Sequence, residues 1–500
     1  MQFRNIIFIV LGLFLIRLLI HSQIVLPLYR CAWPGVPTGV FFATSGDTKS
    51  YTKPWINLIE KGIYSMDGTT PTVNRQPYPG LLFSICYLIT RDETLSMEIT
   101  AVIQILLGSI AIYIMMLLCR YICEDITGNN TISYRAMYLY LILCVLSLHT
   151  LFYDGAILSD GPAIAFVSFF TYSYYQYLIQ NKKTKYLLIS GIFISLVALY
   201  RPYYLAFYPI LILHLGYHLW KNNKTISFIV LRSFYIVFPF IFMNLPWTIR
   251  NYVIFHKFIP FYDPPIHVSG DHIQTCTTYI PIAKQVITFS DAYYVCQYTA
   301  FCYFETHPDS QCPQRFPRYI IGKNLNMNEI ENLNRVHKKY AYSYAYDKKA
   351  GENLIHSAQK MLNYYKMDHP YTYWIWPRLY ALKKFLIHGG TFYFPPFHKG
   401  VSELNPFFFI SLKFLQTGLY WFCLLIGSFG LFYLSIIRVY TSYLLLMPIF
   451  LISFFGIFFM HYESRYFFTS YPILLLGSVF ISVYLTSNLR AKALFSTFKR

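Results

Sequence analysis

The chain has 500 residues, of which 56% are hydrophobic and only 13% are charged, and its mean hydropathy is +0.40. Because soluble globular domains carry about 25% charged residues, this composition excludes an ordinary soluble protein and indicates a polytopic membrane protein. The net charge of +19 could suggest a nucleic-acid partner. Many lysines and arginines lie in short loops between apolar segments, where membrane topology accounts for them, so no nucleic-acid partner is expected.

Ten apolar segments are candidates for membrane-spanning helices, which need about 20 apolar residues each. They are 6–27, 98–119, 136–153, 161–180, 186–200, 203–220, 226–246, 407–436, 442–460 and 466–486. The first segment is longer than the apolar part of a signal peptide and lacks a small-residue cleavage site after it. We therefore expect it to be retained as the first helix.

The apolar segment 78–90 is too short to span a membrane. Its 13 residues would reach about 20 Å as a helix, whereas the hydrocarbon core is about 30 Å thick. We expect it to lie flat in the interface. With this choice and a cytoplasmic N-terminus, lysine and arginine are denser in the inside loops, as the positive-inside rule requires.

This topology divides the chain into three parts. Residues 1–246 form an N-terminal transmembrane module that contains the first outer loop, 28–97. Residues 247–406 form a large non-cytoplasmic loop domain, and 407–500 form three helices and a basic cytoplasmic tail. Four cysteines lie in the loop domain, where two disulfides and free buried thiols are both open alternatives: Cys276, Cys296, Cys302 and Cys312. No CxxC spacing indicates a zinc site.

The unusual charged residues of the membrane part all fall at predicted helix ends on the outer side. They are Asp47, Asp154, Asp160, Arg201, Arg250, Glu463 and Arg465. A charge at membrane depth is costly, so such residues usually face a cavity or pair with a partner. Arginines there could bind a phosphate or diphosphate, because guanidinium donates in a bidentate fork, and Arg75 could join them. The ordinary alternatives are a local pair between Arg465 and Glu463 and snorkelling to the interface.

Asp47 precedes a predicted amphipathic helix that carries Tyr51 and Trp55 and ends near Gly62. The commonest role of an aspartate there is to cap the helix. A carboxylate above a cavity at the membrane edge could instead take a proton from an acceptor hydroxyl or amine. Asp160, two residues before Pro162, has the same two interpretations, and Asp154 is either a second acid or part of a loop.

Five stretches carry a resemblance to a known family. They are "SGDTKSYTKPWINLIEKGIYSMDGTTPTVNRQPYPGLLFSI", "ILSDGPAIAF", "ALYRPYYL", "LPWTIRNYVIFHKFIPF" and "HYESRYFFTSYPILLL". In this order they resemble the GT-C fold membrane glycosyltransferases of the protein-mannosyltransferase and aminoarabinose-transferase type. Beyond the fourth stretch, which ends at residue 261, loop 247–406 matches no motif of that family. Thr48 stands where protein mannosyltransferases carry the second acid of an Asp-Glu pair, so the resemblance does not extend to protein mannosylation in particular.

The resemblance implies an all-α GT-C-like bundle of about ten spans, with interfacial helices in the first outer loop and a large outer loop domain. It implies inverting transfer of a sugar from a polyprenyl-phosphate donor to a lipid, glycan or protein acceptor. Asp47 would be the catalytic base, and Arg250 and Arg465 would hold the phosphate, with Arg201 nearby. The other expected substrate-binding residues are Asp160, which would orient the acceptor or a divalent cation, and Arg75, Tyr51 and Glu463. We expect the site on the periplasmic face of a bacterial inner membrane.

Two other classes of function are open alternatives. A transporter or lipid flippase with an external domain would also have many spans and intramembrane charges, and it predicts helices broken at the midplane and two related halves. A non-catalytic scaffold would bind a partner through loop 247–406. The clustering of unusual charges at one face favours the enzyme.

Overall fold

The computed structural model describes residues 3–32, 35–45, 47–73, 75–179, 183–261, 321–329, 331–332, 356, 360, 363–387, 406–458 and 464–497. These residues are helical almost throughout and contain no strand, only two isolated β-bridges. The predicted all-α class is therefore confirmed. Most of loop 247–406, including its four cysteines, and Glu463 lie outside the described residues, so the predictions made for them are not tested.

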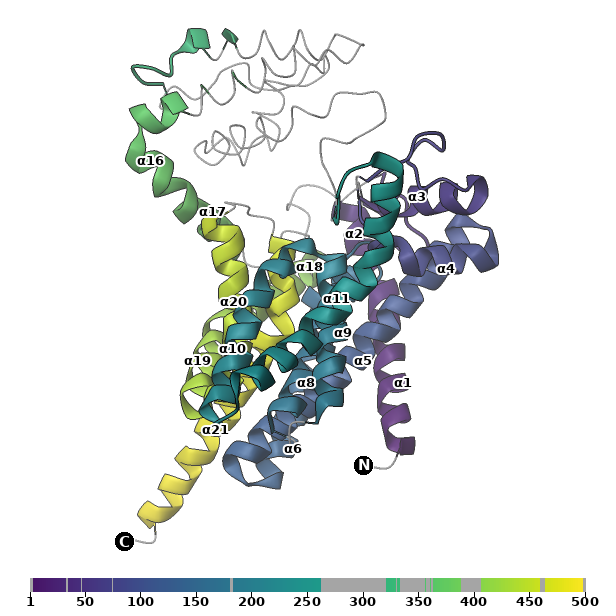
Figure 1. The fold of residues 1–500 in the computed structure, drawn as a ribbon. Coiled ribbons are helices and arrows are strands. Elements are labelled where there is room, and N and C mark those ends of the chain that lie inside the picture. Colours follow the sequence, from purple (N-terminus) through teal and green to yellow (C-terminus); the bar gives the residue numbers. More distant parts are fainter. Residues whose placement is uncertain are drawn as a thin grey trace.

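The N-terminal helix continues without a break through three elements, α1 (Phe3–Ile20), the π-helical turn η1 (His21–Val25) and α2 (Leu26–Ala32). It is followed by α3 (Thr48–Lys61), η2 (Tyr78–Gly80) and α4 (Leu81–Thr90). Figure 1 shows α2, α3 and α4 at one end of the bundle, here called the α3 end, and both termini at the opposite end. As expected, 78–90 is helical and too short to span.

The remaining helices form the bundle and the segments around it. In the first part they are α5 (Glu93–Thr127), α6 (Asn130–Leu146), α7 (Leu148–Asp154), α8 (Asp160–Ile179), α9 (Thr184–Tyr200), η3 (Pro202–Phe207), α10 (Tyr208–Lys221) and α11 (Ile226–Phe255). After the loop they are α16 (Pro370–Trp374), α17 (Trp376–Ile387), α18 (Pro406–Phe422), η7 (Cys423–Gly427), α19 (Ser428–Ile437), η8 (Val439–Thr441), α20 (Ser442–Leu451), η9 (Ile452–Phe458), η10 (Ser464–Ser470) and α21 (Tyr471–Thr497).

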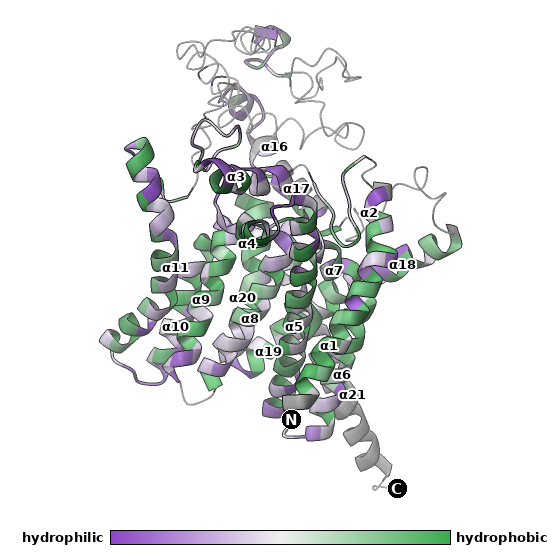
Figure 2. Cartoon of the chain, turned by 90° about the vertical axis from the view of Figure 1, so that its right-hand side faces the viewer, coloured by the Kyte–Doolittle hydropathy of each residue, from purple (hydrophilic) through white to green (hydrophobic). Residues whose placement is uncertain are grey.

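Six helical runs within the described residues are long and apolar enough to cross a membrane. They are Ile6–Arg30, Glu93–Thr127, Ile226–Phe255, Phe407–Ile437, Val439–Phe458 and Arg465–Thr486. A seventh crossing is obtained if α6 and α7, which are bent by 59° at their junction, form one span. Figure 2 shows hydrophobic residues along the length of the bundle helices. The chain is thus an α-helical membrane protein by length and composition, but the predicted count of ten spans is not confirmed.

The three other expected spans are α8, α9 and α10, which are helical but do not meet the same criteria. Helices α9 and α10, with 17 and 14 residues, are short. Helix α8 has 20 residues but is rich in tyrosine, and nearly all its side chains are buried inside the protein. A helix surrounded by other helices needs no lipid-facing apolar surface, and a polar group on it can find a partner in the bundle. In α8 the Tyr174 hydroxyl does so, at 3.0 Å from Nδ1 of His214.

Candidate functional site around Asp47

The side chain of Asp47 does not cap helix α3. Asp47 precedes Thr48 with φ −80° and ψ −21°, and its carboxylate accepts no hydrogen bond from the first turn of the helix. The helix nevertheless ends as predicted, at Gly62, whose left-handed φ of 77° suits a residue without a Cβ. The capping interpretation is therefore wrong for the side chain, and the carboxylate is available to other partners at the positive end of the helix dipole.

Two arginines hold this carboxylate, one on each oxygen. Nη2 of Arg75 lies 2.6 Å from Oδ1 of Asp47, and Nη2 of Arg465 lies 3.3 Å from Oδ2. The three side chains are 28%, 41% and 22% exposed for Asp47, Arg75 and Arg465, so a ligand can reach them. Among the described residues, two guanidinium groups share one carboxylate, and guanidinium groups are donors that suit an anionic ligand.

Two tyrosine rings orient the arginines. The guanidinium of Arg75 lies 5.3 Å from the ring centre of Tyr51, a buried residue on the first turn of α3. Arg465 lies 5.3 Å from the ring of Tyr466, and Arg201 approaches the same ring at 4.9 Å. These are cation–π distances. Tyr466 was not identified from the sequence, although it directly follows Arg465.

Arg201 and Asp160 form a buried ion pair next to this cluster. Their side chains are 7% and 1% exposed. Arg201 follows the last residue of α9 and Asp160 is the first residue of α8, so the pair joins the adjacent ends of two packed helices. Losing one partner of such a pair would leave a lone buried charge. Both residues were predicted for the site. The structure pairs them with each other, and the Tyr466 ring links Arg201 to Arg465.

Arg250 makes its contacts elsewhere. Its Nη1 donates to the carbonyl oxygen of Thr72 at 2.9 Å and its Nη2 donates to that of Tyr64 at 3.3 Å. It therefore ties the first loop to α11, and among the described residues no contact joins it to Asp47 or Arg465. It also lines a cavity of about 480 Å³ together with Trp55, Tyr64 and Trp247. The expected joint action of Arg250 and Arg465 on one phosphate is not seen in this arrangement.

Tyr64 packs against the guanidinium group of Arg250. Its side chain is buried, and burial raises the pKa of its hydroxyl above the ordinary value. Its ring lies 5.7 Å from the guanidinium of Arg250. Because a neutral ring presents its negative face to a cation, the contact favours the charged arginine without an ion pair.

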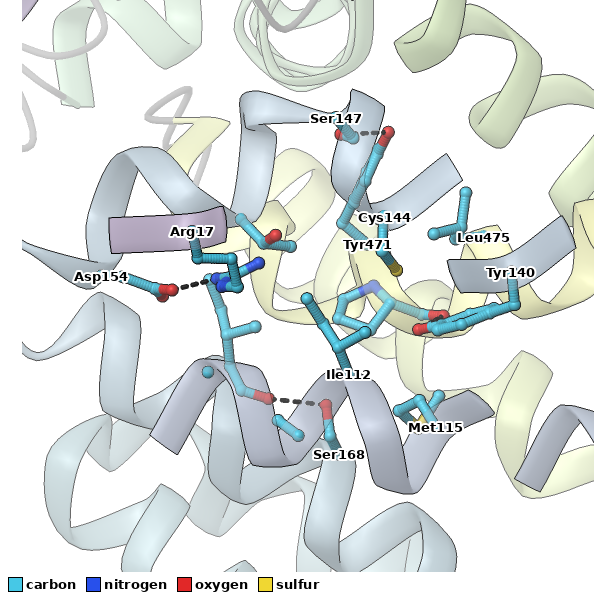
Figure 3. Close-up of a pocket in the computed structure, with 15 residues that line it drawn as sticks. Arg17, Ile112, Met115, Tyr140, Cys144, Ser147, Asp154, Ser168, Tyr471 and Leu475 are labelled. Carbon is cyan, nitrogen blue, oxygen red and sulfur yellow. Dashed lines mark hydrogen bonds and ion pairs between the residues drawn. The ribbon is translucent and has the colours of Figure 1, made fainter. Parts of the chain in front are cut away.

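Asp154 pairs with Arg17 of α1 (Figure 3), not with Arg75 or Arg465. The side chains of Arg17 and Asp154 are both 2% exposed. Arg17 was not identified from the sequence, although a lone charge inside the first apolar segment is a signal for a buried partner.

The described residues do not suit a divalent cation at this site. Nowhere in the described part of the chain do three histidine, cysteine, aspartate or glutamate side chains gather as a metal site requires. Within the described part of the chain, the carboxylates of Asp47 and Asp160 both face arginines. What the arrangement offers is a set of cations around one accessible carboxylate.

No protein-family model matches this chain, and no curated protein or solved structure does either. The functional proposal therefore depends on the motifs of the sequence and on the geometry around Asp47.

Proposed function

We propose that this protein is an inverting glycosyltransferase that moves a sugar from a polyprenyl-phosphate donor to a lipid, glycan or protein acceptor. The observation that carries the proposal is the accessible carboxylate of Asp47 held between the guanidinium groups of Arg75 and Arg465, at one end of an apolar helical bundle. A lipid-linked donor presents an anionic phosphate at the edge of the membrane, where the proposal puts this end of the bundle. The motifs that resemble GT-C enzymes also supply all three residues of this cluster.

The first step of the proposed reaction is an exchange of partners. A donor phosphate competes with the Asp47 carboxylate for the guanidinium groups, because both anions accept bidentate hydrogen bonds from arginine. When Arg75 and Arg465 turn to the phosphate, the Asp47 carboxylate is released from both guanidinium groups and can accept a proton from the acceptor. Binding of the donor thus prepares the base for the next step.

The second step is an in-line displacement at the sugar C1. The acceptor oxygen or nitrogen forms a bond to C1 as its proton passes to Asp47, and the bond between C1 and the phosphate oxygen breaks. Negative charge grows on the departing polyprenyl phosphate, where Arg75 and Arg465 stabilise it. The sugar inverts, and the proton later leaves the Asp47 carboxyl group to water.

The proposal places the site on the periplasmic face of a bacterial inner membrane, in a GT-C-like bundle of ten spans that counts α8, α9 and α10. Two observations support it: the termini lie at the end of the bundle opposite to α3, and basic residues are denser in the loops predicted to be inside. On this topology, loop 247–406 is non-cytoplasmic and would select the acceptor.

The test is sugar transfer by the full chain in proteoliposomes. The donors are short-chain polyprenyl phosphates that carry a radiolabelled hexose or aminopentose, and the acceptors are a cell-envelope extract. We expect Asp47→Asn to lower transfer by about 100-fold to 10,000-fold, the usual contribution of a general base. Asp67→Asn is the matched control, since the hydrogen bonds of the Asp67 carboxylate to described residues all lie within its own turn, to Ser65, Thr69 and Thr70. Undiminished transfer by Asp47→Asn, or transbilayer movement of the donor without sugar transfer, would refute the proposal.

A further inference from the structure

The Arg17–Asp154 ion pair takes no part in the proposed reaction, yet it lies at a costly place inside the apolar bundle. Arg17 comes from α1 and Asp154 ends α7, and Figure 3 shows the guanidinium turned toward the carboxylate. Gly108 of α5 permits this approach: a Cβ there would lie 3.0 Å from Nη2 of Arg17 and would overlap the Asp154 carboxylate. A buried pair of this kind is weak evidence for stability, because the desolvation of both charges offsets their attraction. The position of the pair therefore points to a role other than stability.

The backbone that follows Asp154 is bound to the backbone that precedes Asp47. Ala43 donates its N–H to the carbonyl of Gly155 and accepts from the N–H of Ile157, both at 3.0 Å. These two bonds make a parallel bridge between Ala43 and Ala156. The hydroxyl of Thr48 then donates to the carbonyl of Ile157, also at 3.0 Å. Asp47 thus lies between two residues that are both fixed to segment 155–157.

His21 makes a second connection from the same helix. It is four residues after Arg17, so both side chains lie on one face of the first helix. Its Nε2 lies 3.0 Å from the carbonyl oxygen of Phe41, two residues before Ala43. The ring packs so closely on Gly155 that a Cβ at that position would overlap it. The first helix therefore contacts both bridged segments: His21 reaches Phe41 and Gly155, and Arg17 reaches Asp154.

We propose that Arg17 and Asp154 are positioning residues, which fix segment 155–157 in the bundle and through it hold Asp47 in reach of Arg75 and Arg465. The importance of this positioning for catalysis rests on the proposed function, whereas the positioning itself does not. An ion pair suits the task because it specifies one partner and one position, which apolar contacts do not. Displacement of segment 155–157 would shift Ala43 and Thr48, and with them the carboxylate of Asp47.

A cross-link measures this positioning without any assay of sugar transfer. Ala43→Cys with Ala156→Cys places two thiols on bridged backbones, where Cα atoms are close enough for a disulfide. Ala136→Cys with the native Cys119 is the control, because the Cys119 sulfur lies 3.9 Å from the carbonyl oxygen of Ala136, between α5 and α6. Both pairs are oxidised in membranes and quantified by mass spectrometry.

The decisive variant is Arg17→Met combined with Asp154→Met, which removes the pair without leaving a lone charge. We expect the 43–156 cross-link to form several-fold more slowly, with the 119–136 cross-link unchanged. In the transfer assay we expect turnover to fall by up to about 100-fold with little change in the donor KM, as for a misplaced catalytic group. An unchanged 43–156 cross-link would overturn the inference.

If the double variant fails to fold and loses both cross-links, Gly108→Ala tests the positioning role of the Arg17–Asp154 pair instead. It keeps both charges and only pushes Arg17 and Asp154 apart. Selective loss of the 43–156 cross-link in this variant would support the inference, and retention would overturn it. Absence of sugar transfer by the wild type would contradict the proposed function and would leave the cross-link result valid.

Discussion

Arg465 lies 3.3 Å from the carboxylate of Asp47, although 418 residues separate the two in the sequence. Arg465 belongs to η10, which directly precedes α21, and Asp47 directly precedes α3. The cluster is therefore complete only when the C-terminal helices pack on the N-terminal part of the bundle. Helix α21 takes part in that packing, since the Tyr140 hydroxyl of α6 donates to the carbonyl oxygen of Pro472 at 3.2 Å.

Arg465→Gln should impair the proposed transfer strongly. The change removes a cation that stabilises the departing phosphate, and loss of one such donor costs about 100-fold to 1,000-fold in turnover. Arg465→Lys should retain more activity than Arg465→Gln but less than the wild type, since lysine keeps the charge without the bidentate fork. The measurement is the rate of sugar transfer from the lipid-phosphate donor in proteoliposomes.

Arg438→Gln is the matched control for this substitution. Arg438 pairs with Asp125 at 3.2 Å, with side chains 41% and 34% exposed, and it takes no part in the Asp47 cluster. We expect its transfer rate to equal that of the wild type. Equal rates for Arg465→Gln and Arg438→Gln would exclude a role of Arg465 in the reaction.

The partner exchange makes an unusual prediction for Asp47→Asn. If the carboxylate and the donor phosphate compete for Arg75 and Arg465, then removal of the negative charge should free both arginines for the phosphate. The inactive variant should therefore bind a short-chain polyprenyl phosphate more tightly than the wild type, by at least several-fold. Isothermal titration in detergent measures this affinity, with Asp67→Asn as the control that should not change. Weaker binding by Asp47→Asn would rule out the competition.

The fold class and much of the helix order could be predicted from composition and apolar segment length, because both follow from the thickness of a membrane. The end of α3 at Gly62 could also be predicted, since few other residues adopt a positive φ. The number of spans could not be settled in this way. Helix α8 is buried by other helices. A hydropathy criterion recognises a spanning helix by the apolar side chains that face lipid, so it does not recognise a helix that faces other helices.

For the site, the sequence identified the residues but not their partners. Asp47, Arg75 and Arg465 were predicted from motifs, whereas the sharing of one carboxylate by two arginines depends on tertiary packing. Arg250 illustrates the limit, since its carbonyl partners at Tyr64 and Thr72 have no sequence signature. Arg17 could have been found, because a lone charge within an apolar segment requires a partner.

Breaking the buried ion pair of Asp160 and Arg201 should lower the free energy of unfolding more than breaking the exposed ion pair of Asp125 and Arg438. Asp160→Asn leaves the Arg201 charge buried and unpaired, which we expect to cost about 3–5 kcal/mol. Removal of both charges by Asp160→Met with Arg201→Met should restore most of that loss, because apolar side chains replace a buried pair at little cost. For comparison, Asp125→Asn in the exposed pair with Arg438 should cost at most about 1 kcal/mol. Thermal unfolding in detergent measures all three, and a double variant less stable than Asp160→Asn would contradict this account.

The predicted membrane topology can be tested without an assay of sugar transfer. Lys49 lies on the first turn of α3 and Lys183 directly precedes α9, and both side chains are exposed. Ten spans with 78–90 in the interface put Lys49 outside and Lys183 inside. We expect a membrane-impermeant maleimide to label Lys49→Cys in intact cells and Lys183→Cys only after permeabilisation, with the wild type as the background for native cysteines. Labelling of both positions from the same side would mean that an odd number of the predicted crossings between them is wrong. In that case the positive-inside argument for an outer Asp47 would fail with it.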